Sequence, residues 1–150
     1  MKYKAGPVVE KKEKDATAYF TIHWSNLYKV EKYFIINSVP SVAGIFELYY
    51  MDEKKKLVLM FVSRVWYGGL RTRLRRITDP ELTEHPKRKK LLENRSCYFR
   101  YAISQSFADM QDILFFFAGR YVPGVDAVQP SGRYEEIFIE EISADKITTI

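Results

Sequence analysis

The stretch Ser38–Val62, SVPSVAGIFELYYMDEKKKLVLMFV, decides the fold because two apolar runs flank a short charged spacer. Ile45–Met51 is rich in β-branched and aromatic residues, which predicts a strand. Asp52–Lys56 has the length of a hairpin loop, and Leu57–Val62 predicts a second strand. Because this second run is continuously apolar, we expect it to be covered on both faces and to be central in its sheet. The stretch therefore predicts a β-hairpin.

The sequence after the hairpin predicts three helices and one further strand. The segment LRTRLRRI, residues 70–77, places its apolar residues on one helical face, and HPKRKKLL, residues 85–92, predicts a second short helix. Cys97–Ile103 alternates apolar and polar residues well enough to predict a third strand. Ser106 and Asp109 form a capping-box variant that opens an apolar helix.

The two ends of the chain carry weaker patterns. Ser25 or Asn26 is a suitable N-cap for a helix that runs to about Ile36. Residues 133–142, RYEEIFIEEI, are compatible with an edge strand or a helix, and their aromatic and β-branched residues favour the strand. We therefore expect an N-terminal helix and a C-terminal strand.

The composition indicates a globular chain in a reducing compartment. Its 150 residues favour one domain over residues 17–150, preceded by a Lys/Glu-rich mobile arm over residues 1–16. The one cysteine, Cys97, excludes an internal disulfide framework.

The chain shows neither a secretory signal nor an apolar run of about 18 residues, so we expect no membrane association and a cytoplasmic location. His23 and His85 lack ligand spacing, so no metal site is predicted. The sequence has neither a P-loop nor a GxGxxG motif, and no cofactor is predicted.

The charge is unevenly distributed along the chain. Residues Arg64 to Arg95 include ten Lys/Arg and four Asp/Glu, a net charge of +6 in a chain whose total is +5. After Val125 the sequence is mainly acidic. Such asymmetry is typical of an anionic partner on one face, of a basic helix matched to an acidic tail, or simply of a solvated surface.

The order of hairpin, arginine-rich helix, strand and helix, with Gly44-Ile45-Phe46 opening the first strand, resembles the GIY-YIG domain over residues 39–121. The enzymes of that family are nucleases built on a small central three-stranded antiparallel sheet flanked by helices. The resemblance therefore implies an α+β fold with this central three-stranded sheet, here extended by an N-terminal helix and a C-terminal strand.

The resemblance also assigns the two tyrosine motifs. Phe46 stands where the family has the tyrosine of GIY, and Met60 and Val62 stand where it has the tyrosine and glycine of YIG. A tyrosine hydroxyl can orient or deprotonate water, whereas phenylalanine and methionine cannot. The side chain of Val62 fills the space that the glycine leaves open.

The remaining catalytic positions are assigned in the same way. Arg73 matches the family's catalytic arginine, with Arg71 as the alternative, and Gln111 or Asp112 lies near the position of its metal-binding glutamate. Hydrolysis of a phosphodiester usually needs a divalent cation, and a carboxylate is the normal ligand of magnesium. With the hydroxyls and the glutamate replaced, we expect a noncatalytic domain.

Three functions follow from this interpretation. The first is a noncatalytic GIY-YIG-like domain that binds nucleic acid or another polyanion, with Trp66 and Tyr67 either stacking on bases or covering the core. The second is a protein-interaction or dimerisation module, and the third is a divergent metal-dependent nuclease that uses Arg73 and a substitute carboxylate such as Asp112. The residues predicted to contact phosphates are Arg64, Arg71, Arg73, Arg75, Arg76, Lys87, Arg88, Lys89 and Lys90.

Overall fold

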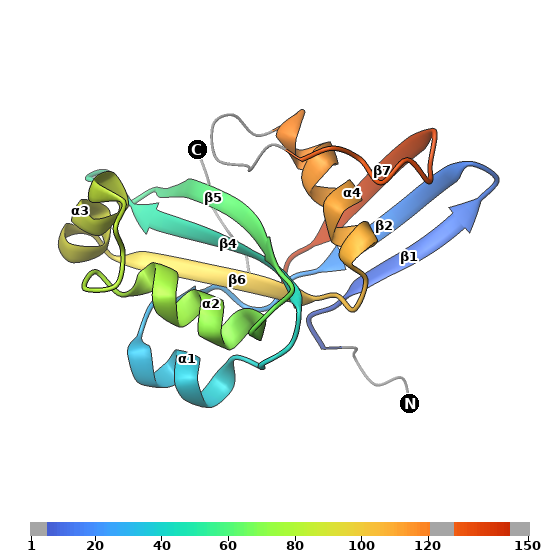
Figure 1. The fold of residues 1–150 in the computed structure, drawn as a ribbon. Helices are drawn as coiled ribbons and strands as arrows, with labels where there is room; N and C mark the ends of the chain where they lie inside the picture. The colour runs from blue at the N-terminus through green and yellow to red at the C-terminus, as the bar shows by residue number, and fades with distance from the viewer. Residues whose placement is uncertain (1–5, 121–127, 145–150) are drawn as a thin grey trace.

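The computed structural model describes residues 6–120 and 128–144, and in this part of the chain seven strands form two sheets flanked by four helices (Figure 1). The strands are β1 (Val9–Lys14), β2 (Thr17–His23), β3 (Tyr28–Lys29), β4 (Gly44–Met51), β5 (Leu57–Val65), β6 (Cys97–Ile103) and β7 (Glu136–Ile142). The helices are α1 (Lys32–Ser38), α2 (Gly69–Thr78), α3 (Pro86–Asn94) and α4 (Phe107–Ala118).

The larger sheet has four antiparallel strands in the order β3-β6-β4-β5. It includes the three predicted strands β4, β5 and β6, but β3 extends it and a separate sheet lies beside it. The predicted single three-stranded sheet is therefore wrong. A sequence pattern identifies strands, whereas their distribution between two sheets depends on contacts between distant segments.

Strand β5 is an edge strand, so its predicted central position is wrong. Its apolar residues from Val58 to Phe61 are only half-buried. The register of the hairpin shifts between Leu48 and Tyr49, and the GIF segment of β4 pairs with Ser63–Val65. The GIF segment therefore does not lie opposite Met60–Val62, the segment that contains the positions assigned to YIG.

The smaller sheet has the order β1-β2-β7, with β1 antiparallel and β7 parallel to β2. Residues 9–14, which were predicted as part of a mobile arm, form β1. Residues 136–142 form a strand, which confirms the prediction of a strand over a helix for this segment. This strand pairs with β2 and does not extend the four-stranded sheet. Residues 1–5 of the predicted arm and Tyr121 at the end of the resembling region lie outside the described residues.

The predicted N-terminal helix begins later than expected. Residues 28–29 form β3, and the Tyr28 ring packs against Phe34, Phe99 and Tyr101 of the neighbouring core. Helix α1 starts at Lys32 because the carboxylate of its N-cap, the preceding glutamate, accepts two backbone N–H bonds. The contribution of Tyr28 to the core thus overrides the local capping signal.

Two hydrophobic clusters lie on opposite faces of the four-stranded sheet. In one cluster, residues of β4, β5 and β6 such as Phe46 pack against α1 and against Leu70 and Leu74 of α2. The other contains Ile45 and Val62 with residues of β2 and α4. Helices α2 and α4 therefore cover different faces of this sheet (Figure 1).

Candidate polyanion-binding surface

Helix α2 buries its apolar side and presents arginines to solvent. Leu70 and Leu74 are fully buried, whereas Arg73 and Arg76 are exposed. The two arginines are three positions apart in the sequence, so they are neighbours on the helix surface. This pair of cations forms the outer surface of the helix predicted from the arginine-rich sequence.

The other two arginines of α2 have structural partners. The Arg71 Nε–H donates a 2.7 Å hydrogen bond to the carbonyl of Val39, which follows α1. An Nη1 atom of Arg75 lies 3.8 Å from a carboxylate oxygen of Asp79, one turn later. Arg71 and Arg75 are half-buried and have these partners, and in this they differ from the exposed Arg73 and Arg76.

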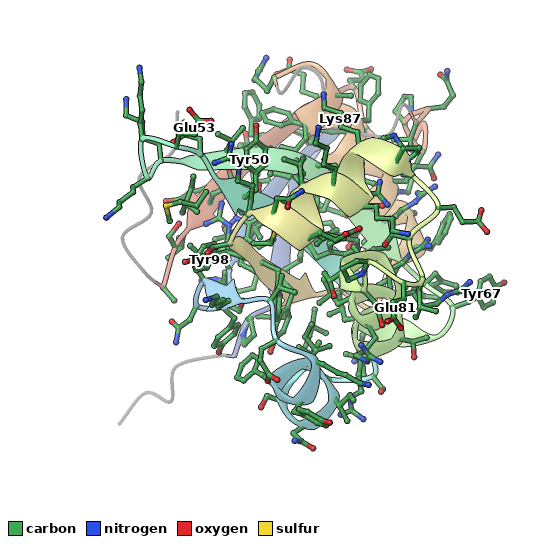
Figure 2. The ribbon with its side chains drawn as sticks, turned by 90° about the vertical axis from the view of Figure 1, so that its left-hand side faces the viewer. Tyr50, Glu53, Tyr67, Glu81, Lys87 and Tyr98 are labelled. Carbon is green, nitrogen blue, oxygen red and sulfur yellow. The ribbon has the colours of Figure 1, made fainter. Side chains whose placement is uncertain are left out.

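Helix α3 adds a second group of cations. It begins at Pro86, and the His85 Nδ1 atom accepts the backbone N–H of Arg88. The Arg88 guanidinium lies 4.4 Å from the centre of the Phe61 ring on β5, which attaches the helix to the sheet. The exposed cations of this helix are Lys87, Lys89 and Lys90, of which Lys87 is labelled in Figure 2.

A cluster of aromatic rings surrounds the end of β5. The Arg64 guanidinium stacks 4.3 Å from the centre of the Phe107 ring, and Trp66 meets the same ring edge-on at 5.8 Å. Trp66 is 39% exposed and Tyr67 is 89% exposed. Of the two predicted stacking residues, Trp66 is partly packed and Tyr67 projects from the body of the molecule (Figure 2).

The positions that correspond to the tyrosine motifs of GIY-YIG do not form an open site. Phe46 is fully buried and packs edge-on against Phe61. Met60 packs at the margin of the same cluster, whereas Val62 points to the opposite face of the sheet. Phe46 and Val62 are thus buried in different clusters and Met60 is half-buried, so the three side chains do not converge on one surface.

The positions assigned to catalysis and metal binding are also separated. Arg73 lies on α2 and Asp112 on α4, and these helices cover opposite faces of the four-stranded sheet. Asp112 is buried, accepts hydrogen bonds from the backbone and hydroxyl of Ser131, and pairs with Arg133 at 2.7 Å. The side-chain amide of Gln111 donates a hydrogen bond to the backbone carbonyl of Gln129, which lies between α4 and β7. Among the described residues, no group of three or more His, Cys, Asp and Glu side chains could hold a metal ion.

Asp112 belongs to an ionic cluster that joins α4 to the smaller sheet. Arg133 bridges Asp109 and Asp112, and the Lys11 ammonium on β1 lies 3.0 Å from Asp109. Desolvation lowers the pKa of Lys11, but its hydrogen bond with Tyr134 and the one that its ammonium donates to Asp109 raise the pKa above its ordinary value. The sequence signal for this cluster was weak, because its members are far apart in the chain.

A second ionic cluster is buried between the two sheets. Glu47 on β4 pairs with Arg100 on β6 and accepts the Tyr49 hydroxyl at 2.8 Å. Arg100 also lies 3.7 Å from Glu141 of β7 and 4.5 Å from the centre of the Trp24 ring. Burial raises the pKa of Glu47 above its usual range, although the Arg100 charge opposes this. Glu141 of the acidic C-terminal segment thus meets a buried arginine of β6.

Comparisons with known proteins give one match. A family model with the description "Uncharacterised protein" matches residues 8–150. Neither a curated protein nor a solved structure matches the chain. None of these comparisons tests the resemblance to GIY-YIG, which stays a prediction.

The helices of the structure also bear on the question of a membrane. Within residues 6–120 and 128–144, each helix is too short or too polar to cross a bilayer. The cytoplasmic location stays a prediction.

Proposed function

The chain belongs to this family of uncharacterised proteins, and from its geometry we propose that it is a noncatalytic domain that binds nucleic acid or another polyanion through α2 and α3. The observation that carries the proposal is the exposure of five cations on two consecutive helices. These cations are Arg73, Arg76, Lys87, Lys89 and Lys90.

The electrostatics of the segment support the proposal. Residues 64–95 have a net charge of +6, and such a concentration of positive charge attracts polyanions from a distance. Binding to phosphates releases condensed counterions, so the affinity depends steeply on salt. A basic surface that is merely solvated gives no such dependence.

The test is a binding titration at several salt concentrations. We expect the wild-type protein to bind heparin and a labelled oligonucleotide, with log K falling linearly as log salt rises. The variant Arg73→Glu/Arg76→Glu removes two cations that lie outside the hydrogen bonds of Arg71 and Arg75. Its slope on a single strand should be smaller by about 1.4, from about 0.7 per lost phosphate contact.

A variant with the same change in net charge provides the control. Lys12→Glu/Lys14→Glu alters two exposed lysines of β1, far from α2 (Figure 1). We expect its slope to stay close to that of the wild type. Equal weakening in both variants would mean that net charge acts without a defined surface, and equal retention of heparin by the α2 variant would contradict the proposal.

A dimerisation module is the second candidate. Phe107 and Phe115 are 42% and 44% exposed and lie two turns apart on α4, so they share one side of the helix. A second copy of the chain would cover these two rings. Sedimentation velocity at micromolar concentrations tests the idea, because Phe115→Ser should then shift the protein from dimer to monomer.

A further inference from the structure

Tyr67 is highly exposed and directly precedes a tightly packed glycine turn. It has the largest exposed fraction, 89%, among the large hydrophobic residues in the described part of the chain. It precedes Gly68 and Gly69, both in the left-handed region at φ 81° and 77°. A Cβ atom on Gly69 would lie 2.6 Å from the backbone carbon of Ser41, so this turn packs tightly against the preceding loop. The Tyr67 ring is therefore presented to solvent from a constrained turn.

The neighbouring rings form a partly exposed continuation of this surface. Trp66 packs edge-on against Phe107, and Arg64 stacks on the same ring. The Arg64 Nη1 atom is shielded from solvent and lacks a hydrogen-bond partner among the described residues. A buried donor without an acceptor is unfavourable, so the Arg64 guanidinium carries an unsatisfied N–H group beside this aromatic surface.

The exposed cations of α2 follow directly along the chain. Arg73 lies four residues after Gly69, the first residue of α2, which is about 6 Å along the helix axis. Arg76 lies about 4.5 Å further in the same direction. Tyr67 thus lies just before the helix that carries both exposed arginines. An aromatic ring close to exposed cations is the combination that binds a strand through its bases and its phosphates.

We propose that Tyr67, with Trp66 beside it, is a base-stacking platform, so that the polyanion bound by this protein is a single-stranded nucleic acid. This inference rests on the proposed function. Within a duplex each base is already stacked on its neighbours, whereas the bases of a single strand have free faces for aromatic side chains. Arg73 and Arg76 contact the phosphates that follow the stacked base.

The test compares three probes by fluorescence anisotropy: a labelled single-stranded oligonucleotide, a duplex of equal length, and heparin as a polyanion without bases. Tyr67→Ala should weaken binding to the single strand by about 5- to 140-fold, which corresponds to about 1–3 kcal/mol of stacking per base at 1.4 kcal/mol per tenfold. Tyr67→Phe should retain the affinity, because it keeps the ring. Tyr19→Ala, which removes a 45% exposed tyrosine from β2, is the control.

The outcomes separate the inference from the proposed function. A specific loss of single-strand binding in Tyr67→Ala, with unchanged heparin binding, supports both. If Tyr67→Ala binds the single strand as well as the wild type does, or if the duplex binds as tightly as the single strand, the platform is refuted while the polyanion surface stands. If the wild-type protein binds none of the three probes, both ideas fail.

Discussion

Replacement of Arg100 by methionine should destabilise the fold strongly. Arg100 is 7% exposed, pairs with Glu47, and donates a 2.9 Å hydrogen bond to the Ser143 hydroxyl. Its loss leaves the Glu47 carboxylate, which is 1% exposed, without its paired charge and with the Tyr49 hydroxyl as a hydrogen-bond donor. Breaking a buried pair in this way costs about 3–5 kcal/mol, out of a total stability of about 5–15 kcal/mol for a domain.

The assay is urea unfolding, followed by far-UV circular dichroism and by tryptophan fluorescence. We expect Arg100→Met to lower the midpoint without changing the slope of the transition. The double variant Glu47→Leu/Arg100→Met should be more stable than Arg100→Met, since it removes the unpaired buried charge. A loss below about 1 kcal/mol for Arg100→Met would refute the view that this pair is essential to the packing of the two sheets.

The same variant has a defined pH dependence. Burial raises the pKa of Glu47 in the folded protein, so its ionised form disfavours folding and its protonated form does not. Without Arg100 this effect is larger. The stability deficit of Arg100→Met should therefore be greatest near neutral pH and should shrink as the pH falls toward the unfolded-state pKa, about 4.3. A deficit that grows on acidification would contradict this sign.

Three further predictions concern other parts of the molecule. Gly44→Ala should lower the free energy of unfolding in urea by about 1–3 kcal/mol, because the new Cβ would lie 2.4 Å from the carbonyl oxygen of Ala102. Gly119→Ala, whose Cβ would have an ordinary 3.5 Å contact, should stay within about 0.5 kcal/mol of the wild type. Burial raises the pKa of Cys97 to about 11, so its reaction with a thiol reagent at pH 8 should be at least about 100-fold slower than in urea, and equal rates would place the thiol at the surface. Plasmid DNA should remain uncut with Mg²⁺ or Mn²⁺, and cleavage that Arg73→Ala abolishes would establish a nuclease.

Elements whose ends are determined by local chemistry could be predicted from the sequence. Helix α2 follows the predicted apolar face, and α4 begins with the predicted cap, in which the Ser106 hydroxyl accepts the backbone N–H of Asp109. The separation into two sheets could not be predicted in this way. Thr17–His23 pairs with residues 136–142, and no local pattern specifies a partner so distant in the chain.

The candidate surface could be predicted in its composition but not in its detail. The sequence identifies the basic segment, yet it cannot distinguish Arg73 from Arg71, whose guanidinium binds a backbone carbonyl after α1. It also cannot show that Phe107, from another helix, lies beneath Arg64. Both distinctions depend on tertiary contacts between elements that are separate in sequence.

The parallel pairing of β2 with β7 affects how the protein is made. The β1–β2 hairpin leaves the ribosome early, yet Trp24, the residue after β2, has its hydrogen-bond partner Glu141 117 residues later in the chain. Throughout that interval the edge of β2 that later pairs with β7 stays open, and an open strand edge is a feature that leads to aggregation. Synthesis of this chain therefore includes a vulnerable period that ends only when β7 emerges, and a ribosome stalled before residue 136 would hold a polypeptide unable to complete its second sheet.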